Sequence, residues 1–262
     1  MTRPVRFEVG DDGVGLVTLA RPEKRNALDP ATIEGLSAAL AVAEADPRVR
    51  VVLLAAEGKD FCAGADLAHI EATVDDPRDA LVEDARRMAA IFLRMRRLPK
   101  PIVAAVHGSA LAGGAGLATA CDLVLASEDA RFGYPEIHIG FVPAMVMTML
   151  VRIVGQKQAF ELATRGEPIG AERARDLGLV NCVYSRHTFP EDSRSYAAEL
   201  ATRSPTALAL TKELFYELDD LSFADGLERG AEVNADARTT DDCRAGLRAI
   251  LARRRGEVPA AE

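Results

Sequence analysis

Three apolar runs, at residues 50–55, 102–106 and 122–126, lack the polar alternation of a strand that is buried on one face only. A strand covered on both faces is apolar along nearly its whole length. Helical segments lie between these runs, so neighbouring strands are joined by crossovers and run parallel. The sequence therefore predicts an α/β body around a sheet that is buried on both faces.

Local start and turn signals add further elements. Asp11-Asp12-Gly13 separates extended segments at 5–9 and 15–20 and predicts a hairpin. Asp29-Pro30 supplies an N-cap and a first helical residue for a helix that ends at Ala45. A long helix is expected at 79–98, where prolines follow.

The pattern changes after Val183, where helical segments replace the alternation of strands and helices. No low-complexity linker separates the two parts. We therefore expect a core at residues 1–195 that carries the active site, and a helical tail at 196–262 that packs on this core or on a neighbouring subunit. The helices expected after Val183 are 190–202, 205–218, 223–238 and 241–254.

Composition excludes several classes of protein. The 262-residue chain has a net charge of −8, whereas a broad nucleic-acid or anionic-membrane surface needs an excess of Lys and Arg. Its four cysteines are far apart and its four histidines lack ligand spacing, so neither a disulfide framework nor a metal site is expected. Since no apolar run is long enough to cross a bilayer and no signal-peptide pattern begins the chain, we expect a cytoplasmic protein.

Two glycine-rich stretches, 58–66 and 107–117, each follow a buried strand and lead into a helix. Ligands of parallel sheets bind in loops beyond the carboxyl ends of the strands. Small residues let a ligand approach the backbone, and N–H groups at a helix start lack internal partners. Taken singly, the first stretch is also explained as a tight strand-to-helix turn with Asp66 as a helix cap. The second is also explained as a close helix–strand contact that needs glycine for space. Together they favour a site for developing negative charge.

A third stretch, 132–143, places Glu136 among apolar residues just after a turn. A carboxylate in such surroundings has a raised pKa and can exchange protons near neutral pH. The alternatives are an exposed Glu136 or one paired with Arg131. His138 is a candidate to orient Glu136, whereas His107 is expected to be structural.

These three stretches together resemble the crotonase superfamily, which contains enoyl-CoA hydratases and isomerases. The resemblance covers about residues 15–185 and implies a spiral of parallel-strand ββα units, a coenzyme A thioester substrate and no cofactor. It also implies a homotrimer or a dimer of trimers, with the helical tail serving oligomerisation and pocket closure. Further matching segments are Arg21-Pro22, Asn26-Ala27-Leu28, Lys100-Pro101, Cys121-Asp122-Leu123 and Gly178-Leu179-Val180.

The resemblance also implies roles for particular residues. The backbone N–H groups of Ala65 and Gly113 match the family's oxyanion hole, and Glu136 matches its second catalytic glutamate. In the family's Gly-Gly-Gly-x-Glu-Leu pattern this chain has 112–117, so Gly116 replaces the first glutamate. The substrate-binding positions implied are Lys24, Arg25, Ala63, Asp66, Leu67, Gly114, Gly116, Tyr134 and Met145.

Several functions remain open at this point. One carboxylate is sufficient for a 1,3-proton shift, so Glu136 alone makes 3-enoyl to 2-enoyl isomerisation the simplest reaction. A single carboxylate can also hold water and deliver both its parts to one face of a double bond, and family hydratases with Gly at position 116 exist. Hydration is therefore our first hypothesis and isomerisation the second. A CoA-binding scaffold would not need Glu136, and a dinucleotide oxidoreductase would need a glycine fingerprint that 114–119 completes only in part.

Overall fold

The computed structural model describes residues 3–255. A six-stranded sheet has the spatial order β1-β2-β3-β4-β6-β9, with β1 antiparallel to β2 and every other pair parallel. A smaller sheet has the order β5-β7-β8. The strands are β1 (Val5–Val9), β2 (Val14–Leu19), β3 (Val51–Ala56), β4 (Ile102–Val106), β5 (Ser109–Leu111), β6 (Leu123–Ser127), β7 (Arg131–Gly133), β8 (Ile169–Gly170) and β9 (Cys182–Tyr184).

Helices account for most of the remaining chain. The α-helices are α1 (Pro30–Ala45), α2 (Leu67–Thr73), α3 (Arg78–Arg97), α4 (Gly113–Thr119), α5 (Ala144–Val154), α6 (Gln156–Arg165), α7 (Ala171–Asp176), α8 (Phe189–Ala201), α9 (Pro205–Glu217), α10 (Phe223–Thr239) and α11 (Asp241–Arg254). The short 3-10 helices are η1 (Pro22–Lys24), η2 (Pro135–Ile139) and η3 (Leu218–Asp220).

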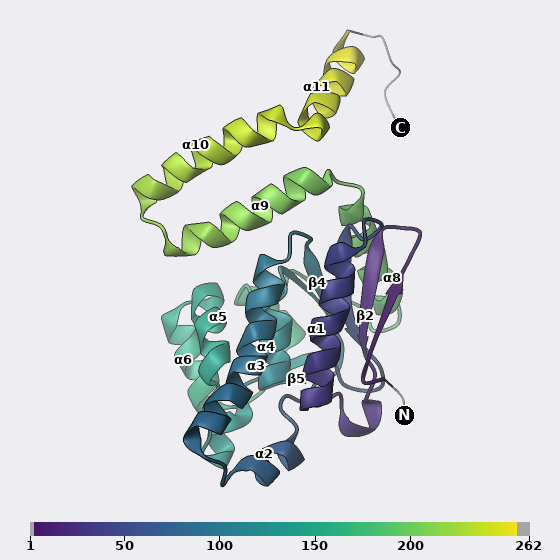
Figure 1. The fold of residues 1–262 in the computed structure, drawn as a ribbon. Coiled ribbons are helices and arrows are strands. Elements are labelled where there is room, and N and C mark those ends of the chain that lie inside the picture. Colours follow the sequence, from purple (N-terminus) through teal and green to yellow (C-terminus); the bar gives the residue numbers. More distant parts are fainter. Residues whose placement is uncertain (1–2, 256–262) are drawn as a thin grey trace.

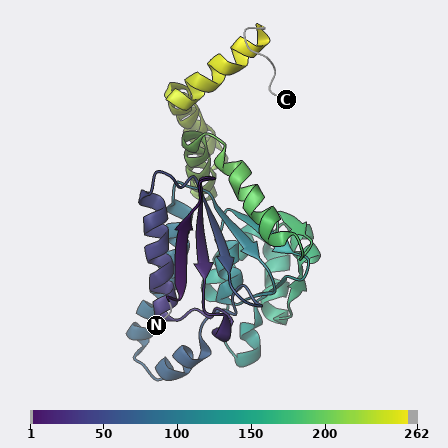
Figure 2. The ribbon, with the colours of Figure 1, turned by 90° about the vertical axis from the view of Figure 1, so that its right-hand side faces the viewer.

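The large sheet is covered on both faces, as its apolar runs predict. Along β3, Val52 and Leu54 join the cluster that includes residues of α1, α3 and α4, whereas Val51 and Leu53 pack with α8. Figure 2 shows the sheet between α1 on one side and α8 on the other. The expected α/β class is confirmed. The apolar runs lack polar alternation because both faces of the sheet are covered.

The turn and capping residues in the sequence form the predicted hairpin and helix starts. β1 and β2 form the hairpin, with Gly13 at φ 79° in the turn between them. The Asp29 carboxylate caps α1 by accepting from the Thr32 amide at 2.8 Å. Asp66 caps α2 in the same way, through the Ala68 amide at 3.1 Å. These caps satisfy amide groups that a helix start leaves without internal partners.

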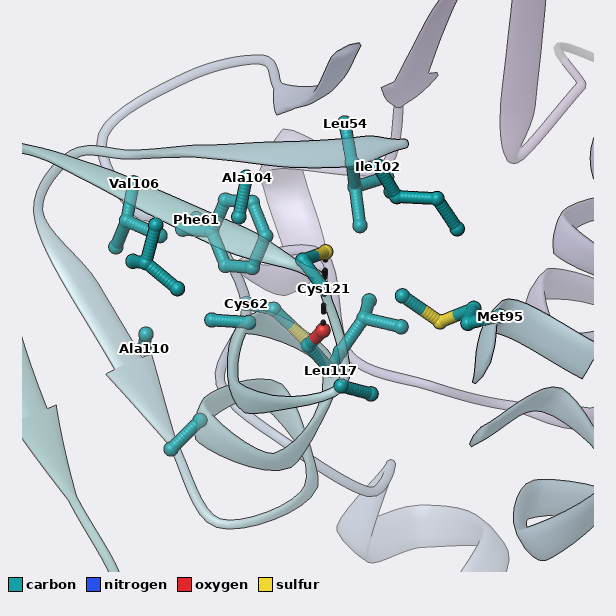
Figure 3. Packing of buried hydrophobic residues seen from close by; sticks show 14 of the residues in the cluster. Leu54, Phe61, Cys62, Met95, Ile102, Ala104, Val106, Ala110, Leu117 and Cys121 are labelled. Atoms are coloured by element: carbon teal, nitrogen blue, oxygen red, sulfur yellow. Dashed lines mark hydrogen bonds between the residues drawn. The ribbon is translucent and has the colours of Figure 1, made fainter. Parts of the chain in front are cut away.

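The topology brings the two glycine-rich stretches together. β3 and β4 are neighbouring parallel strands, so the chain leaves both at the same edge of the sheet. Figure 3 shows Phe61 and Cys62 of the first stretch in one apolar cluster with Ala104 of β4 and Leu117 of α4. Because these side chains are buried, they anchor both loops to the core.

The expected boundary at residue 195 lies inside α8. Phe189, Ala197 and Ala201 of α8 are buried against the sheet. The helices α9, α10 and α11 project beyond one end of the body, away from α2 (Figure 1). Residues 256–262 of the expected tail lie outside the described residues.

The structure contains no helix in residues 3–255 that is both long and apolar enough to cross a membrane. Within the same residues, no group of three His, Cys, Asp or Glu side chains is arranged to hold a metal ion.

Candidate active site

The two glycine-rich loops run side by side and are joined by backbone hydrogen bonds. The Cys62 amide donates to Ser109 O at 3.0 Å, and the Leu111 amide donates to Cys62 O at 2.9 Å. Gly114 lies against the same residue, since a Cβ at position 114 would be 2.3 Å from Cys62 O. Close packing therefore requires glycine at position 114. His107 has a structural contact, with Nε2 3.1 Å from Gly58 O.

The first loop presents the amide of Ala65. Gly64 O accepts from the Leu28 amide at 2.8 Å, and the Asp66 amide donates to Leu28 O at 3.0 Å. The C=O and N–H of one trans peptide point in opposite directions. Because the Gly64 carbonyl faces Leu28, the Ala65 N–H points away from Leu28. Among residues 3–255, no group accepts a hydrogen bond from the Ala65 N–H.

The second loop presents the amide of Gly113. Ala112 O accepts from the Gly116 amide at 3.0 Å inside α4, so the N–H of the same peptide points out of the helix. A Cβ at Gly113 would lie 3.8 Å from Ala65 N. The two amides are therefore adjacent. Two unpaired N–H groups at one place can hold an oxygen on which negative charge develops.

Glu136 is tied to this second loop through the small sheet. β5 pairs with β7, with Leu111 opposite Gly133, and the Ala112 amide donates to Gly133 O at 2.8 Å. The chain then turns into η2, which carries Glu136. The pairing of β5 with β7 thus fixes where the carboxylate lies relative to the Gly113 amide.

The Glu136 carboxylate is buried and without an ion-pair partner in the described part of the chain. The residue is 9% exposed, and Oε2 has no hydrogen-bond partner among residues 3–255. Burial raises the pKa of Glu136, because water no longer stabilises its charged form. Neither an exposed turn glutamate nor a pair with Arg131 describes this geometry. A raised pKa suits a group that both accepts and returns a proton.

His138 does not orient Glu136 in this structure. It is exposed, and its imidazole lies beside the end of α6, where a Cβ at Gly166 would be 2.7 Å from His138 Nε2. Successive residues of the tight helix η2 point in different directions, so the side chain two positions after Glu136 leaves on another side.

A family model described as enoyl-CoA hydratase/isomerase matches residues 10–257. The chain belongs to the enoyl-CoA hydratase/isomerase family. Its expected membership of the crotonase superfamily is confirmed.

Relatives match over nearly the whole chain. A Thermus thermophilus protein, whose name gives enoyl-CoA hydratase as an unproven activity, is 44% identical over 92% of this chain and 95% of its own length. The 2,3-dehydroadipyl-CoA hydratase of Escherichia coli is 34% identical over 91% of this chain and 92% of its own. The crystal structure of a Mycobacterium smegmatis enoyl-CoA hydratase superposes with a TM-score of 0.91 at 32% identity, covering 95% and 96% of the two chains.

Apolar side chains fill the space beside Gly116. A Cβ at Gly116 would lie 2.6 Å from Val146 Cγ2 and 3.2 Å from Phe92 Cζ. Val146 comes from α5 and Phe92 from α3, and both are buried. Val146 and Phe92 thus occupy the space beside Gly116, which the sequence alone did not indicate at either position.

Two further substrate-binding residues implied by the resemblance differ in exposure. Met145 of α5 is half-buried and packs against the core. Tyr134 is 1% exposed, and burial raises the pKa of its phenol to about 12, so it is neutral at physiological pH. Ala63 of the first loop is half-buried, and Leu67, the first residue of α2, is exposed.

The cations of the N-terminal region have distinct surroundings. Arg21 lies between two carboxylates, 2.9 Å from Asp29 and 3.3 Å from Asp66, and thereby joins α1 to the cap of α2. Arg25 pairs with Asp60 at 2.7 Å, yet its side chain is 54% exposed. Lys24, at the end of η1, is exposed. Arg21 is therefore structural, whereas Lys24 and Arg25 face solvent.

Proposed function

We propose that this chain is an enoyl-CoA hydratase with Glu136 as its catalytic carboxylate. The observation that carries the proposal is the buried Glu136 carboxylate, whose Oε2 has no partner among residues 3–255, on a segment tied to the Gly113 loop. Family membership supports coenzyme A thioester chemistry, and the name of the Escherichia coli relative supports hydration.

In the proposed mechanism, the thioester oxygen accepts hydrogen bonds from the Ala65 and Gly113 amides. Glu136 takes a proton from water as the water oxygen adds to the β-carbon. The electron pair of the double bond moves toward the thioester, and the two amides stabilise the resulting enolate. The protonated Glu136 then returns the proton to the α-carbon. No second carboxylate is needed, and none stands at Gly116.

We assign the substrate's two ends to different residues. Lys24 and Arg25 are proposed to hold CoA phosphates, because both are exposed cations beside the first loop. Leu67 and Met145 are proposed to contact the apolar acyl chain. The other substrate-binding positions that we propose, which shape the loops and their surroundings, are Ala63, Asp66, Gly114, Gly116 and Tyr134.

Isomerisation of 3-enoyl-CoA to 2-enoyl-CoA is the second candidate. The apolar contacts that fill the space beside Gly116 favour it, since they leave Glu136 without a second group to activate water. A non-catalytic CoA-binding scaffold is the third candidate, and the buried carboxylate counts against it.

We also propose a cytoplasmic homotrimer or dimer of trimers, with the helices after α8 serving oligomerisation and pocket closure. These helices expose many large apolar side chains, which a neighbouring subunit would cover. The residues are Phe215, Leu218, Leu221, Phe223, Leu227, Leu247, Ile250 and Leu251.

The test is to incubate the protein separately with crotonyl-CoA and 3-hexenoyl-CoA, following mass and absorbance. Glu136→Gln is the key variant, and Glu213→Gln, at an exposed position of α9, is its matched control. Gain of one water on crotonyl-CoA, lost only in Glu136→Gln, is the expected result. Conversion of 3-hexenoyl-CoA without a change in mass, together with unchanged crotonyl-CoA, would instead identify an isomerase.

A further inference from the structure

Each of the two adjacent amides is preceded by a residue in the left-handed region. Gly64, before Ala65, has φ 95°, which glycine adopts readily. Ala112, before Gly113, has φ 51° and ψ −124°. A residue with a β-carbon is strained in this conformation and keeps it only where the surroundings enforce it.

Three contacts hold Ala112 in this conformation. Its amide donates to Gly133 O at 2.8 Å, and its carbonyl accepts from the Gly116 amide at 3.0 Å. Its methyl group faces Gly64, because a Cβ at position 64 would lie 2.8 Å from Ala112 Cβ. The contact therefore joins the residues that directly precede the two amides.

From this contact we infer that Ala112 is a positioning residue for the oxyanion site. Its methyl group sets the separation of the 64–65 and 112–113 peptides and limits rotation of the 112–113 peptide. The strained backbone thus keeps the Gly113 N–H aimed at the place where charge develops. This inference rests on the proposed function, in which both amides bind the thioester oxygen.

Glycine at position 112 separates this role from a purely structural one. Glycine adopts the same φ and ψ without strain, so the fold is not weakened by the backbone conformation. However, glycine lacks the methyl group, and the 112–113 peptide then has more orientations available. Electrostatic stabilisation of a transition state depends on donors that are already oriented. Ala112→Gly should therefore affect the chemical step more than the binding of substrate.

Two readouts test the inference. The first is kcat and KM for crotonyl-CoA. The second is the infrared carbonyl stretch of bound butyryl-CoA labelled with ¹³C at the thioester, which needs no turnover and reports polarisation by the two amides. Ala120→Gly is the matched control, because Ala120 is buried at the other end of α4 with an ordinary φ of −77°.

For Ala112→Gly we expect kcat to fall about tenfold, with KM changed less than twofold. We also expect a smaller carbonyl shift and an equal or higher Tm. Ala120→Gly should keep the wild-type kcat and carbonyl shift while lowering Tm. A carbonyl shift equal to wild type in Ala112→Gly would overturn the inference, whether or not its Tm fell.

The two proposals fail in distinguishable ways. If wild-type protein shifts the butyryl-CoA carbonyl but converts no enoyl-CoA, the hydratase proposal fails, and the comparison with Ala112→Gly still decides the role of Ala112. If wild-type protein binds butyryl-CoA without shifting its carbonyl, the amides do not bind the thioester oxygen and the inference falls.

Discussion

Burial of Glu136 works against the stability of the fold. Its pKa is raised in the folded state, so the unfolded chain binds fewer protons at this group between the two pKa values. Stability therefore decreases as pH rises from the unfolded pKa through the folded pKa, and the full penalty is present above the folded pKa. At a pH well below both values the carboxyl is protonated in both states and the penalty is absent.

Glu136→Gln should therefore abolish turnover and yet raise Tm at pH 7, by about 2 °C. The gain should disappear near pH 3, well below the ordinary pKa of 4.5, where the carboxyl is protonated in both states. Thermal melts of both proteins at the two pH values measure the difference. A lower Tm for the variant at pH 7 would mean that the charged form of Glu136 has a stabilising partner.

Gly116→Glu should destabilise the protein, because the new side chain would overlap Val146 Cγ2, 2.6 Å from the Cβ position. We expect the free energy of unfolding, measured with denaturant, to fall by about 2 kcal/mol. Adding Val146→Ala makes room and should recover part of this loss. Equal destabilisation of the single and double variants would show that Val146 does not limit the space at position 116.

At the scale of elements, α9 is fastened to the body by a buried polar cluster. Lys212, 7% exposed, donates to Asp122 Oδ2 at 2.7 Å and to Met95 O at 2.9 Å, and the Tyr216 hydroxyl donates to Asp122 Oδ1 at 2.8 Å. The Asp122 carboxylate also accepts from the Ile102 amide at 2.6 Å. The start of β4, the start of β6 and the middle of α9 thus share one carboxylate.

Lys212→Met should cost about 3 kcal/mol of unfolding free energy, since it leaves a half-buried carboxylate without its cation. The matched control is Arg203→Met, which removes the exposed pair with Glu199 and should cost less than about 1 kcal/mol. Denaturant unfolding of both variants and of Lys212→Met/Asp122→Asn measures the coupling. Similar losses from the buried and exposed pairs would show that the cluster does not fasten α9.

Much of the fold could be predicted from the sequence because its signals are local. Uninterrupted apolar runs predicted β3, β4 and β6, and Asp29-Pro30 predicted the start of α1. The strands β5, β7 and β8 were not predicted, since they span only two or three residues and exist through pairing with distant segments. A strand so short carries no periodicity that sequence reasoning can use.

The candidate site also combines features that the sequence indicated with features that only tertiary packing produces. The glycine-rich loops and Glu136 were found by composition and by resemblance to the family. The partnership of Val146 and Phe92 beside Gly116 was missed, because it arises only when α3, α4 and α5 pack together. The left-handed Ala112 was also missed, since alanine gives no sign of positive φ and tertiary contacts impose it.

At the scale of the whole molecule, the projecting tail exposes apolar side chains that the body does not cover. Phe223, at the start of α10, is 85% exposed. If α9–α11 pack on neighbouring subunits, Phe223→Asp should convert the proposed trimer to monomers. Light scattering coupled to size exclusion would then give one third of the mass of a wild-type trimer, or one sixth of the mass of a dimer of trimers. Asn234→Asp, which adds the same charge at another exposed position of α10, should leave the mass unchanged.

The adjacent N–H groups of Ala65 and Gly113 belong to the main chain, so no ordinary exchange of side chains can delete either donor except proline. Substitutions that the packing tolerates can therefore change side chains around the proposed oxyanion site without removing its hydrogen-bond donors. The matching chemical edit is to the backbone itself: lactic acid at position 65 would replace one amide by an ester and remove a single N–H. In this protein, the two proposed donors depend on the course of the backbone more than on the identity of the side chains.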